Sequence, residues 1–497
     1  MIVPNMKYSE LLAFNRELEQ SLDNDRYQAV ILSNITVFQL KEILEVALRT
    51  VGIPITATVG DFDNIVQDTA RYSNSDLVVI FWETCNIVDG LQYRIEMMDD
   101  GQRNEIVQRD NSEFDLVCNQ LAQTSLVLFN RFSVAAFGQA SPTSSAMDNM
   151  AAELNSYVEN NIPENFRLID TSKIERQIGF EQSYNLRNFY SSKALYSVDF
   201  MRGYAAAVSP YIRSASGKSK KVLIFDCDNT LWRGILGEDG YDGIDMSFDS
   251  RSGRYYHEVQ ALAYGLNRDG ILLAICSKNN VGEVEDVLDH HPHAILRKSH
   301  FSAMRINWAD KVSNIREISE ELNVGLDSLV FIDDSSFEAD IVRQQLPDVT
   351  VLQVPDKLYD YPRLLRDNAG LFYNLSVTEE DQNKTAMYRA QAERSTAKSA
   401  FANLDDYLSS LDLQVTVYKD CIDQLARLSQ LSLKTNQFNL TTHRYTETDI
   451  ARFIESANHT VFSFDVADKF GDYGITGLCI LVMDTKSGTA TIDTLLM

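Results

Sequence analysis

Two aspartates separated by one residue follow a short apolar run near the middle of the chain. The run, residues 222–225, has the composition of a buried strand, and the pentad after it is Asp226-Cys227-Asp228-Asn229-Thr230. Where a chain leaves a strand, both carboxylates can face one open site. One carboxylate can attack phosphorus while the other moves protons, and a divalent cation can bind beside them. An ordinary acidic turn is the alternative, and for Asp-x-Asp alone it is the commoner outcome.

A second apolar run, residues 271–276, ends in a hydroxyl and a polar loop. Ser277 is placed to donate to a phosphoryl oxygen, and the loop after it offers backbone N–H groups to the same oxygens. Lys278 and Asn279, within this loop, are candidates for binding the substrate. A plain strand-to-helix turn is the alternative. Further on, Lys311 opens a predicted helix, where an ammonium would neutralise phosphoryl charge, although a solvated surface lysine is common.

A third apolar run, residues 329–332, leads directly into Asp333 and Asp334. Two adjacent carboxylates at the end of a buried strand repel each other unless a cation lies between them. Together with Asp226 and the backbone carbonyl of Asp228, they predict an oxygen-rich site suited to Mg²⁺. A helix N-cap with an acidic neighbour is the alternative, and it accounts for one of the two residues better than for both.

Composition limits the classes of partner. The chain has 497 residues and a net charge of −26, which argues against nucleic acid or an anionic membrane surface as a partner, because phosphate recognition needs basic surface. No apolar run is long enough to span a bilayer, and the N-terminus lacks a signal-peptide pattern. The six cysteines show no Cys-x-x-Cys spacing, which favours reduced thiols in a cytoplasmic protein.

The length predicts about three domains. Residues 1–215 alternate predicted strands with helices, which implies a parallel α/β sheet, and residues 218–370 form a second α/β unit. Residues 371–497 form a third domain that ends within an apolar run, so we expect it to be incomplete. A polar linker is predicted at 213–220. The predicted strands are residues 29–32, 55–59, 77–81, 126–129, 222–225, 271–276, 329–332, 413–418 and 477–482.

The ordered set of strand-Asp-x-Asp-x-Thr, strand-Ser, Lys and strand-Asp-Asp resembles the haloacid-dehalogenase (HAD) superfamily of phosphotransferases. The resemblance implies that Asp226 is the nucleophile that becomes an aspartyl phosphate and that Asp228 is the general acid and then the base. It also implies that Thr230 and Ser277 orient the phosphoryl group and that Lys311 binds it. By the same resemblance, Asp333 holds Mg²⁺ with support from Asp334.

One branch of that superfamily, the FkbH-like proteins of subfamily IIIC, is similar over most of the chain. The motifs are residues 226–234, 237–240, 277–280, 306–308, 331–334, 434–442 and 470–474. This resemblance implies an SGNH-hydrolase-like or flavodoxin-like first domain, a Rossmann-like phosphatase core and a partial α+β domain similar to GNAT acyltransferases. It also implies removal of phosphate from 1,3-bisphosphoglycerate and loading of a glyceryl unit onto an acyl carrier protein. A small-molecule or sugar phosphatase in a polysaccharide or secondary-metabolite pathway, and a non-catalytic scaffold, are the alternatives.

Two absences refine these expectations. The spacing between Ser277 and Lys311 leaves no room for an inserted cap domain, and glycines at every third position of residues 234–243 predict only a flexible flap, built as a hairpin. Either a large carrier presents the substrate, or the flanking domains form the lid. In the first domain, Ser33 stands where an SGNH nucleophile would stand, yet no histidine precedes His257, so we expect a binding or lid module without hydrolase activity.

Overall fold

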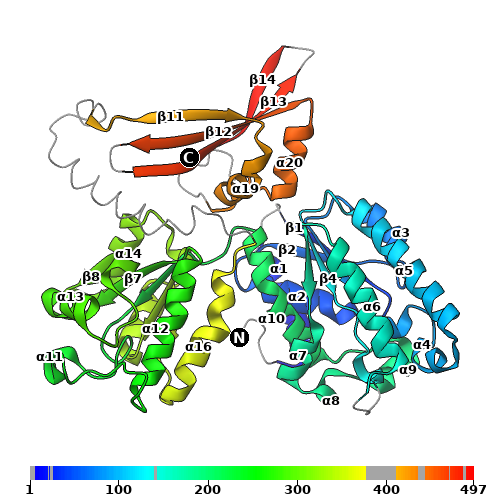
Figure 1. Ribbon diagram of the computed structural model, residues 1–497, viewed down its shortest axis with the longest axis horizontal. Helices are drawn as coiled ribbons and strands as arrows, with labels where there is room; N and C mark the ends of the chain where they lie inside the picture. Colours follow the sequence, from blue (N-terminus) through cyan, green and yellow to red (C-terminus); the bar gives the residue numbers. More distant parts are fainter. Residues whose placement is uncertain are drawn as a thin grey trace. The chain divides into compact units, whose positions relative to one another are not determined.

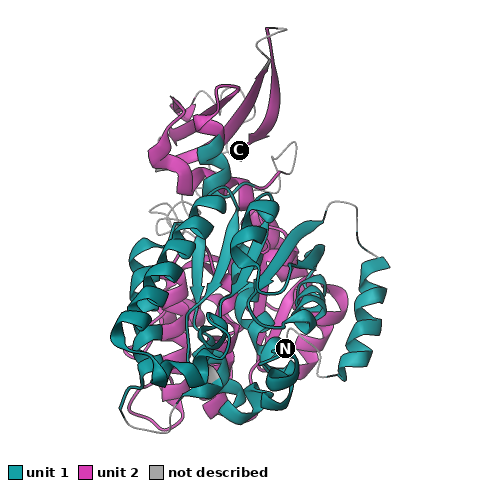
Figure 2. Ribbon diagram, turned by 90° about the vertical axis from the view of Figure 1, so that its right-hand side faces the viewer, with its two compact units in different colours: residues 1–216, 445–452 teal, residues 217–444, 453–497 magenta. Residues whose placement is uncertain are grey.

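The computed structural model describes residues 6–20, 22, 26–138, 143–375, 410–434, 443–468, 471–484 and 488–497 (Figure 1). Two compact units are distinguished in Figure 2: residues 1–216 with 445–452, and residues 217–444 with 453–497. Among the described helices, none combines the length and the apolar character that crossing a bilayer requires. The resembling motif at 434–442 lies almost wholly outside the described residues.

The first unit contains a parallel sheet of five strands in the order β2-β1-β3-β4-β5. The strands are β1 (Tyr27–Ser33), β2 (Ile55–Val59), β3 (Leu77–Phe81), β4 (Leu126–Asn130) and β5 (Phe166–Ile169). β3 and β4 are buried along their whole length, which explains why they are apolar instead of alternating, apart from Asn130 at the end of β4. The sequence predicted the first four strands. It missed β5, which is only four residues long and carries Arg167.

Helices connect these strands. They are α1 (Tyr8–Gln20), α2 (Phe38–Arg49), α3 (Ile65–Tyr72), α4 (Leu91–Arg94), α5 (Asp100–Gln120), α6 (Ala146–Asn161), α7 (Thr171–Ile178), α8 (Phe180–Ser183), α9 (Leu186–Ser192) and α10 (Val198–Ala215). The predicted linker began too early, because α10 continues through Arg213 to Ala215 and buries both residues.

The second unit contains a parallel sheet in the order β10-β9-β6-β7-β8. Its strands are β6 (Val222–Phe225), β7 (Leu272–Ser277), β8 (Phe301–Ile306), β9 (Leu329–Asp333) and β10 (Thr350–Gln353). Alternate residues of β6 enter two separate cores, with Leu223 and Phe225 in one and Val222 and Ile224 in the other. The sheet is therefore covered on both faces, as a Rossmann-like core requires.

Helices of this unit belong to one core or the other. They are α11 (Leu236–Asp239), α12 (Gly253–Arg268), α13 (Val281–His290), α14 (Lys311–Glu321), α15 (Ser336–Gln345) and α16 (Tyr361–Asn368). α14 has one buried apolar face, because Val312, Ile315 and Ile318, with Leu322 just after the helix, all lie in the same core.

The flap after the pentad differs from the predicted hairpin. An isolated antiparallel bridge joins Arg233 to Asp245, but α11 lies between them as a helical turn. Asp239 ends that turn and accepts a hydrogen bond from the Ile235 backbone N–H with its Oδ2, at 2.8 Å. A side chain at Gly243 would collide with the Asp239 carbonyl oxygen, so this glycine allows a close backbone approach. The glycine spacing thus serves a compact turn within the flap.

The C-terminal part contains an antiparallel sheet in the order β11-β12-β13-β14, and helices lie between its first two strands in the sequence. The elements are β11 (Gln414–Lys419), α19 (Leu425–Lys434), α20 (Glu447–Glu455), β12 (His459–Asp468), β13 (Gly471–Asp484) and β14 (Thr489–Leu496). Both predicted strands are present, at β11 and within β13. α20 begins with a capping box, in which the Thr446 hydroxyl and the Asp449 carboxylate accept each other's backbone N–H.

Ser33 is the last residue of β1 and is 5% exposed. Its Oγ accepts a hydrogen bond from the Ile35 backbone N–H at 3.1 Å, which closes a local turn. A local bond of this kind suits a structural serine, and the absence of hydrolase activity in this unit stays a prediction.

A buried glutamate follows β3 in the same unit. Glu83 is 1% exposed, and its Oε1 accepts a hydrogen bond from the Tyr196 hydroxyl at 2.9 Å. Its Oε2 has no hydrogen-bond partner among the described residues. Burial raises the pKa of Glu83 to about 8, because transfer of the charged form out of water is unfavourable.

We expect Glu83→Gln to remove part of the pH dependence of stability. Folded Glu83 keeps its proton up to about pH 8, whereas an unfolded glutamate loses it near its ordinary pKa of 4.5. The folded state therefore binds the extra proton in this window, and its stability falls as pH rises through it. In urea denaturation, the free energy of unfolding of the variant should rise relative to that of the wild type by about 1 kcal/mol or more between pH 5 and pH 9. The exposed substitution Glu153→Gln is the control, and equal pH slopes for both variants would contradict the prediction.

Candidate active site

Asp226 and Asp333 are brought together by the pairing of two central strands. Phe225 of β6 is the register partner of Ile332 of β9, so the next residue on each strand is an aspartate. The Asp226 backbone N–H donates to the Ile332 carbonyl at 3.0 Å, which extends the ladder to the carboxylate. The sheet order reverses between these two strands, and open α/β sheets bind ligands outside the carboxyl ends of strands at such a point.

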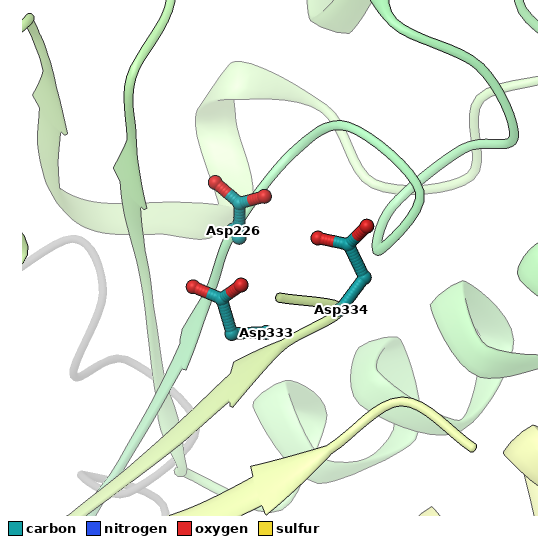
Figure 3. A group of neighbouring side chains, drawn as sticks. All are labelled: Asp226, Asp333 and Asp334. Carbon is teal, nitrogen blue, oxygen red and sulfur yellow. The ribbon is translucent and has the colours of Figure 1, made fainter. Parts of the chain in front are cut away.

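Three carboxylates gather at this place. Oxygens of Asp226, Asp333 and Asp334 lie within 4.8 Å of one another, and Figure 3 shows all three side chains at the ends of the two strands. Asp226 is 6% exposed and Asp333 is fully buried, whereas Asp334 is partly exposed. Asp334 is therefore the most solvent-accessible of the three carboxylates.

Lys311 lies between two of these carboxylates. Its Nζ is 3.1 Å from Asp226 Oδ1 and 2.5 Å from Asp333 Oδ2, and the lysine is 5% exposed. Lys311 is the first residue of α14, whose N-cap Asp310 accepts a hydrogen bond from the Ser313 backbone N–H. The cap fixes where the helix starts and thereby where the ammonium points.

The protonation equilibria follow from burial and from the charges. Burial and the neighbouring charge of Asp226 raise the pKa of Asp333 to about 6, although Lys311 and the Ser335 backbone N–H oppose this shift. The same two causes raise the pKa of Asp334. Burial alone would lower the pKa of Lys311, but the two carboxylates outweigh it and raise that pKa, so the ammonium stays charged.

A tight loop carries the chain from Asp226 to the flap. Asn229 has a φ of 52°, in the left-handed region that asparagine tolerates better than most residues. The Gly234 backbone N–H donates to Asn229 Oδ1 at 3.0 Å, and the Asn229 backbone N–H donates to the Gly234 carbonyl at 3.3 Å. These two bonds close the loop and direct Asp228 back toward the strand ends. Cys227 points into the apolar core, as expected for the residue between the two aspartates.

Asp228 does not belong to the group of three clustered carboxylates and is held by other residues. Its Oδ1 accepts from the Trp232 indole N–H and from the Leu236 backbone N–H, each at 3.0 Å. Its Oδ2 accepts from Asn279 Nδ2 at 3.0 Å. Burial raises the pKa of Asp228 despite these three donors. Its backbone carbonyl remains a predicted cation ligand.

The two predicted hydroxyls are both buried. Thr230 is fully buried, and its Oγ1 has no hydrogen-bond partner among the described residues, while its carbonyl accepts from the Tyr361 hydroxyl at 3.0 Å. Ser277 ends β7 and is 2% exposed. An unpartnered buried hydroxyl is costly, so Thr230 Oγ1 keeps an unused capacity for a hydrogen bond.

The two residues expected to bind substrate have protein partners. Lys278 Nζ lies 2.6 Å from Glu338 Oε1 at the start of α15, and Asn279 donates to Asp228. Sequence reasoning missed both Glu338 and Trp232. Trp232 follows the pentad within residues 226–234, so its closeness to Asp228 could be seen in the sequence. Its hydrogen bond could not, because that bond depends on the orientation of the ring. Glu338 had no signal of its own.

The donor set around the three carboxylates fits a hard divalent cation. Carboxylate oxygens are the ligands that Mg²⁺ prefers, and a single ammonium leaves three clustered carboxylates under-neutralised. Asp226, Asp333 and Asp334 are therefore the residues that could hold such an ion.

Comparison with known proteins supports the fold. Neither a known protein-family profile nor any curated protein matches this sequence. Among solved structures, the chain is similar to the N-terminal part of the protein BF1531 from Bacteroides fragilis, which contains a phosphatase domain and was crystallised in complex with Mg. The two share 24% sequence identity with a TM-score of 0.64, over 75% of this chain and 100% of that one. The likeness confirms the predicted α/β fold class.

We expect Lys311→Met to destabilise the fold at neutral pH in the absence of divalent cations. The substitution leaves Asp226 and Asp333 buried without their ammonium, and breaking a buried pair in this way costs about 3–5 kcal/mol. Urea denaturation measures the change. The exposed Lys218, whose Nζ lies 4.0 Å from Asp327, provides the control, because Lys218→Met should cost less than about 1 kcal/mol. A loss for Lys311→Met no larger than the control's would contradict the compensating role of Lys311.

Proposed function

We propose that the chain is a Mg²⁺-dependent phosphatase or phosphotransferase of the HAD superfamily that works through an aspartyl phosphate on Asp226. The observation that carries the proposal is the cluster of Asp226, Asp333 and Asp334 around Lys311, at the point where the sheet order reverses. The similar fold of a phosphatase domain complexed with Mg adds support.

In the proposed reaction, a carboxylate oxygen of Asp226 attacks phosphorus. The bond from Asp226 to phosphorus forms as the bond to the leaving oxygen breaks, and Asp228 gives its proton to that leaving oxygen. A water oxygen then attacks phosphorus and gives one proton to Asp228, while the bond from phosphorus to Asp226 breaks, which restores the Asp226 carboxylate and releases phosphate. Thr230 and Ser277 donate to the phosphoryl oxygens, and the Lys311 ammonium favours the charge of the transition state.

Mg²⁺, when bound, would supply positive charge that neutralises the phosphoryl oxygens. Asp226, Asp333 and Asp334 would hold it, with the backbone carbonyl of Asp228. The protein's own part is to keep these oxygens in place before the ion arrives, which the strand register does for Asp226 and Asp333.

For the substrate, we propose a phosphorylated acyl group of the glyceryl type, derived from 1,3-bisphosphoglycerate and destined for an acyl carrier protein. The supporting observation is the shape of the core: residues between Ser277 and Lys311 form α13 and β8, which belong to the core and make no inserted cap. Trp308 and Phe337, which precede Lys311 and follow Asp334, are 72% and 71% exposed. Exposed aromatic residues close in sequence to Lys311 and Asp334 suit a substrate presented by a larger carrier.

A small-molecule or sugar phosphatase shares every chemical step at phosphorus and is the second candidate. Incubation with 1,3-bisphosphoglycerate and a carrier protein, followed by intact-mass measurement of the carrier, separates the two. A glyceryl adduct on the carrier supports loading. Phosphate release without any adduct supports a plain phosphatase. The absence of both phosphate release and adduct supports a non-catalytic scaffold. The SGNH-like and GNAT-like assignments of the flanking parts belong to the same proposal.

We expect Asp226→Asn to lower kcat by about a thousandfold or more, equivalent to about 4 kcal/mol of transition-state stabilisation, because the amide cannot act as the nucleophile. Phosphate release from p-nitrophenyl phosphate measures this. The exposed substitution Asp289→Asn is the matched control and should leave kcat unchanged. An unchanged melting temperature would show that the lost activity is chemical, and retention of activity in Asp226→Asn would refute the proposed nucleophile.

We also expect Asp334→Asn to raise the Mg²⁺ concentration needed for half-maximal activity roughly tenfold or more. Asp334 is partly exposed and ends no strand, so the fold should persist. The melting temperature of the wild type should rise with added Mg²⁺, since an ion bound only by the folded state stabilises it. Activity that survives chelation of divalent cations would contradict the metal site.

A further inference from the structure

The Asp228 carboxylate has an asymmetric set of hydrogen bonds. Oδ1 accepts two N–H groups, from the Trp232 indole and the Leu236 backbone, and Oδ2 accepts one, from Asn279. All three donor–acceptor distances are 3.0 Å. The donors come from two separated segments, the residues after the pentad and the loop after β7, which meet at this one side chain.

The donor from Asn279 cannot exchange places with its own amide oxygen. Asn279 Oδ1 accepts the Asn280 backbone N–H at 3.0 Å, which requires an oxygen at that position. Its Nδ2 must therefore face Asp228. Asn279 is 5% exposed, so its side chain has little freedom to turn.

The indole N–H is equally fixed. Trp232 is 1% exposed and packs in the same core as Leu236 and Ile244 of the flap. A ring that is so fully buried holds one orientation, and its N–H therefore stays directed at the carboxylate to which it donates. Both side-chain donors are thus set by their surroundings before any substrate binds.

This pattern determines which oxygen of Asp228 can carry an acidic proton. A carboxylate oxygen has two lone-pair positions in its plane, and on Oδ1 both accept N–H groups that cannot themselves accept a proton. On Oδ2 only one position is occupied, by Asn279. The remaining position of Oδ2 is the place where a proton is held without losing a hydrogen bond.

We infer that Asn279 and Trp232 are positioning residues that select Oδ2 of Asp228 as the oxygen which delivers the proton to the leaving group. This inference rests on the proposed function. The Oδ2–H bond breaks as its proton passes to the leaving oxygen, which keeps the electron pair of the broken P–O bond. In the second step the same Oδ2 accepts a proton from the attacking water.

The consequence is a selective effect on substrates. A leaving oxygen that forms a stable anion needs little help from an acid, whereas a strongly basic leaving oxygen needs the proton in the transition state. Loss of a positioning residue should therefore harm substrates with basic leaving groups most. A residue that merely supports the fold would lower the rate of all substrates alike.

The test compares Asn279→Ala with Asn280→Ala on a series of substituted phenyl phosphates, from p-nitrophenyl phosphate to unsubstituted phenyl phosphate and an alkyl phosphate. Asn280→Ala keeps the backbone N–H and removes an exposed side chain, so its kcat/KM should match the wild type throughout. Asn279→Ala should lower kcat/KM by about a hundredfold for the alkyl phosphate and less than about threefold for p-nitrophenyl phosphate. Trp232→Phe, a second variant, should show the same steepened dependence. A uniform loss, or no loss, across the series for Asn279→Ala overturns the inference while the proposed function stands.

A spectroscopic readout separates this inference from the proposed function. The chain contains three tryptophans, so ¹⁵N-labelled indole gives three N–H signals, and Trp232→Phe identifies the one from Trp232. That signal should move in Asp228→Asn and in Asn279→Ala and stay in place in Asn280→Ala. If the wild type hydrolyses none of the phosphates, the proposed function fails, yet a Trp232 signal that moves as expected still supports the Asn279–Asp228–Trp232 arrangement. A signal that does not respond to Asn279→Ala overturns it.

Discussion

The ion pairs of Lys311 with Asp226 and Asp333 are the interaction on which the site depends. Burial of an ammonium and two carboxylates is expensive, and hydrophobic residues of similar size would often stabilise a fold as well or better. Stability alone therefore gives no reason for this arrangement. A cluster of incompletely neutralised carboxylates at the carboxyl ends of the strands is suited to binding a further cation and a phosphoryl group.

The sheet order explains why residues so far apart in sequence meet. In the order β10-β9-β6-β7-β8, the chain starts in the middle and extends first to one side and then to the other. The ends of β6 and β9 consequently lie together without any connection covering them. Because β7 neighbours β6 on its other side, the residues after β7 reach Asp228 from the opposite direction. The reversal of the strand order thus brings together the ends of β6, β9 and β7, where the aspartates and the serine lie.

Most of the strands and charged residues that form the site could be predicted from the sequence. The same physical reasons explain why other elements were missed. β6, β7 and β9 are central and buried on both faces, and they are apolar up to the polar residue that ends β7 and β9, so each is visible as an uninterrupted run. β10 is an edge strand with a single buried residue, and β8 is interrupted by Ser302 and Arg305, so neither shows such a run. The flap was mispredicted because glycine spacing reports backbone freedom and not the helical turn that Asp239 closes. The charged side chains were predictable from residue type, whereas the contacts of Glu338 and Trp232 depend on rotamers that no local pattern reveals.

The charge balance also implies an order of events in the proposed reaction. Three carboxylates cluster where one ammonium pairs with two of them, and the other lysine of these loops, Lys278, is paired with Glu338. With the net charge of the chain at −26, a phosphoryl group approaching this cluster meets repulsion at close range and at long range. A divalent cation reverses the close-range part, because it adds two positive charges where the three carboxylates converge. In the proposed reaction, Mg²⁺ should therefore bind before the phosphorylated substrate.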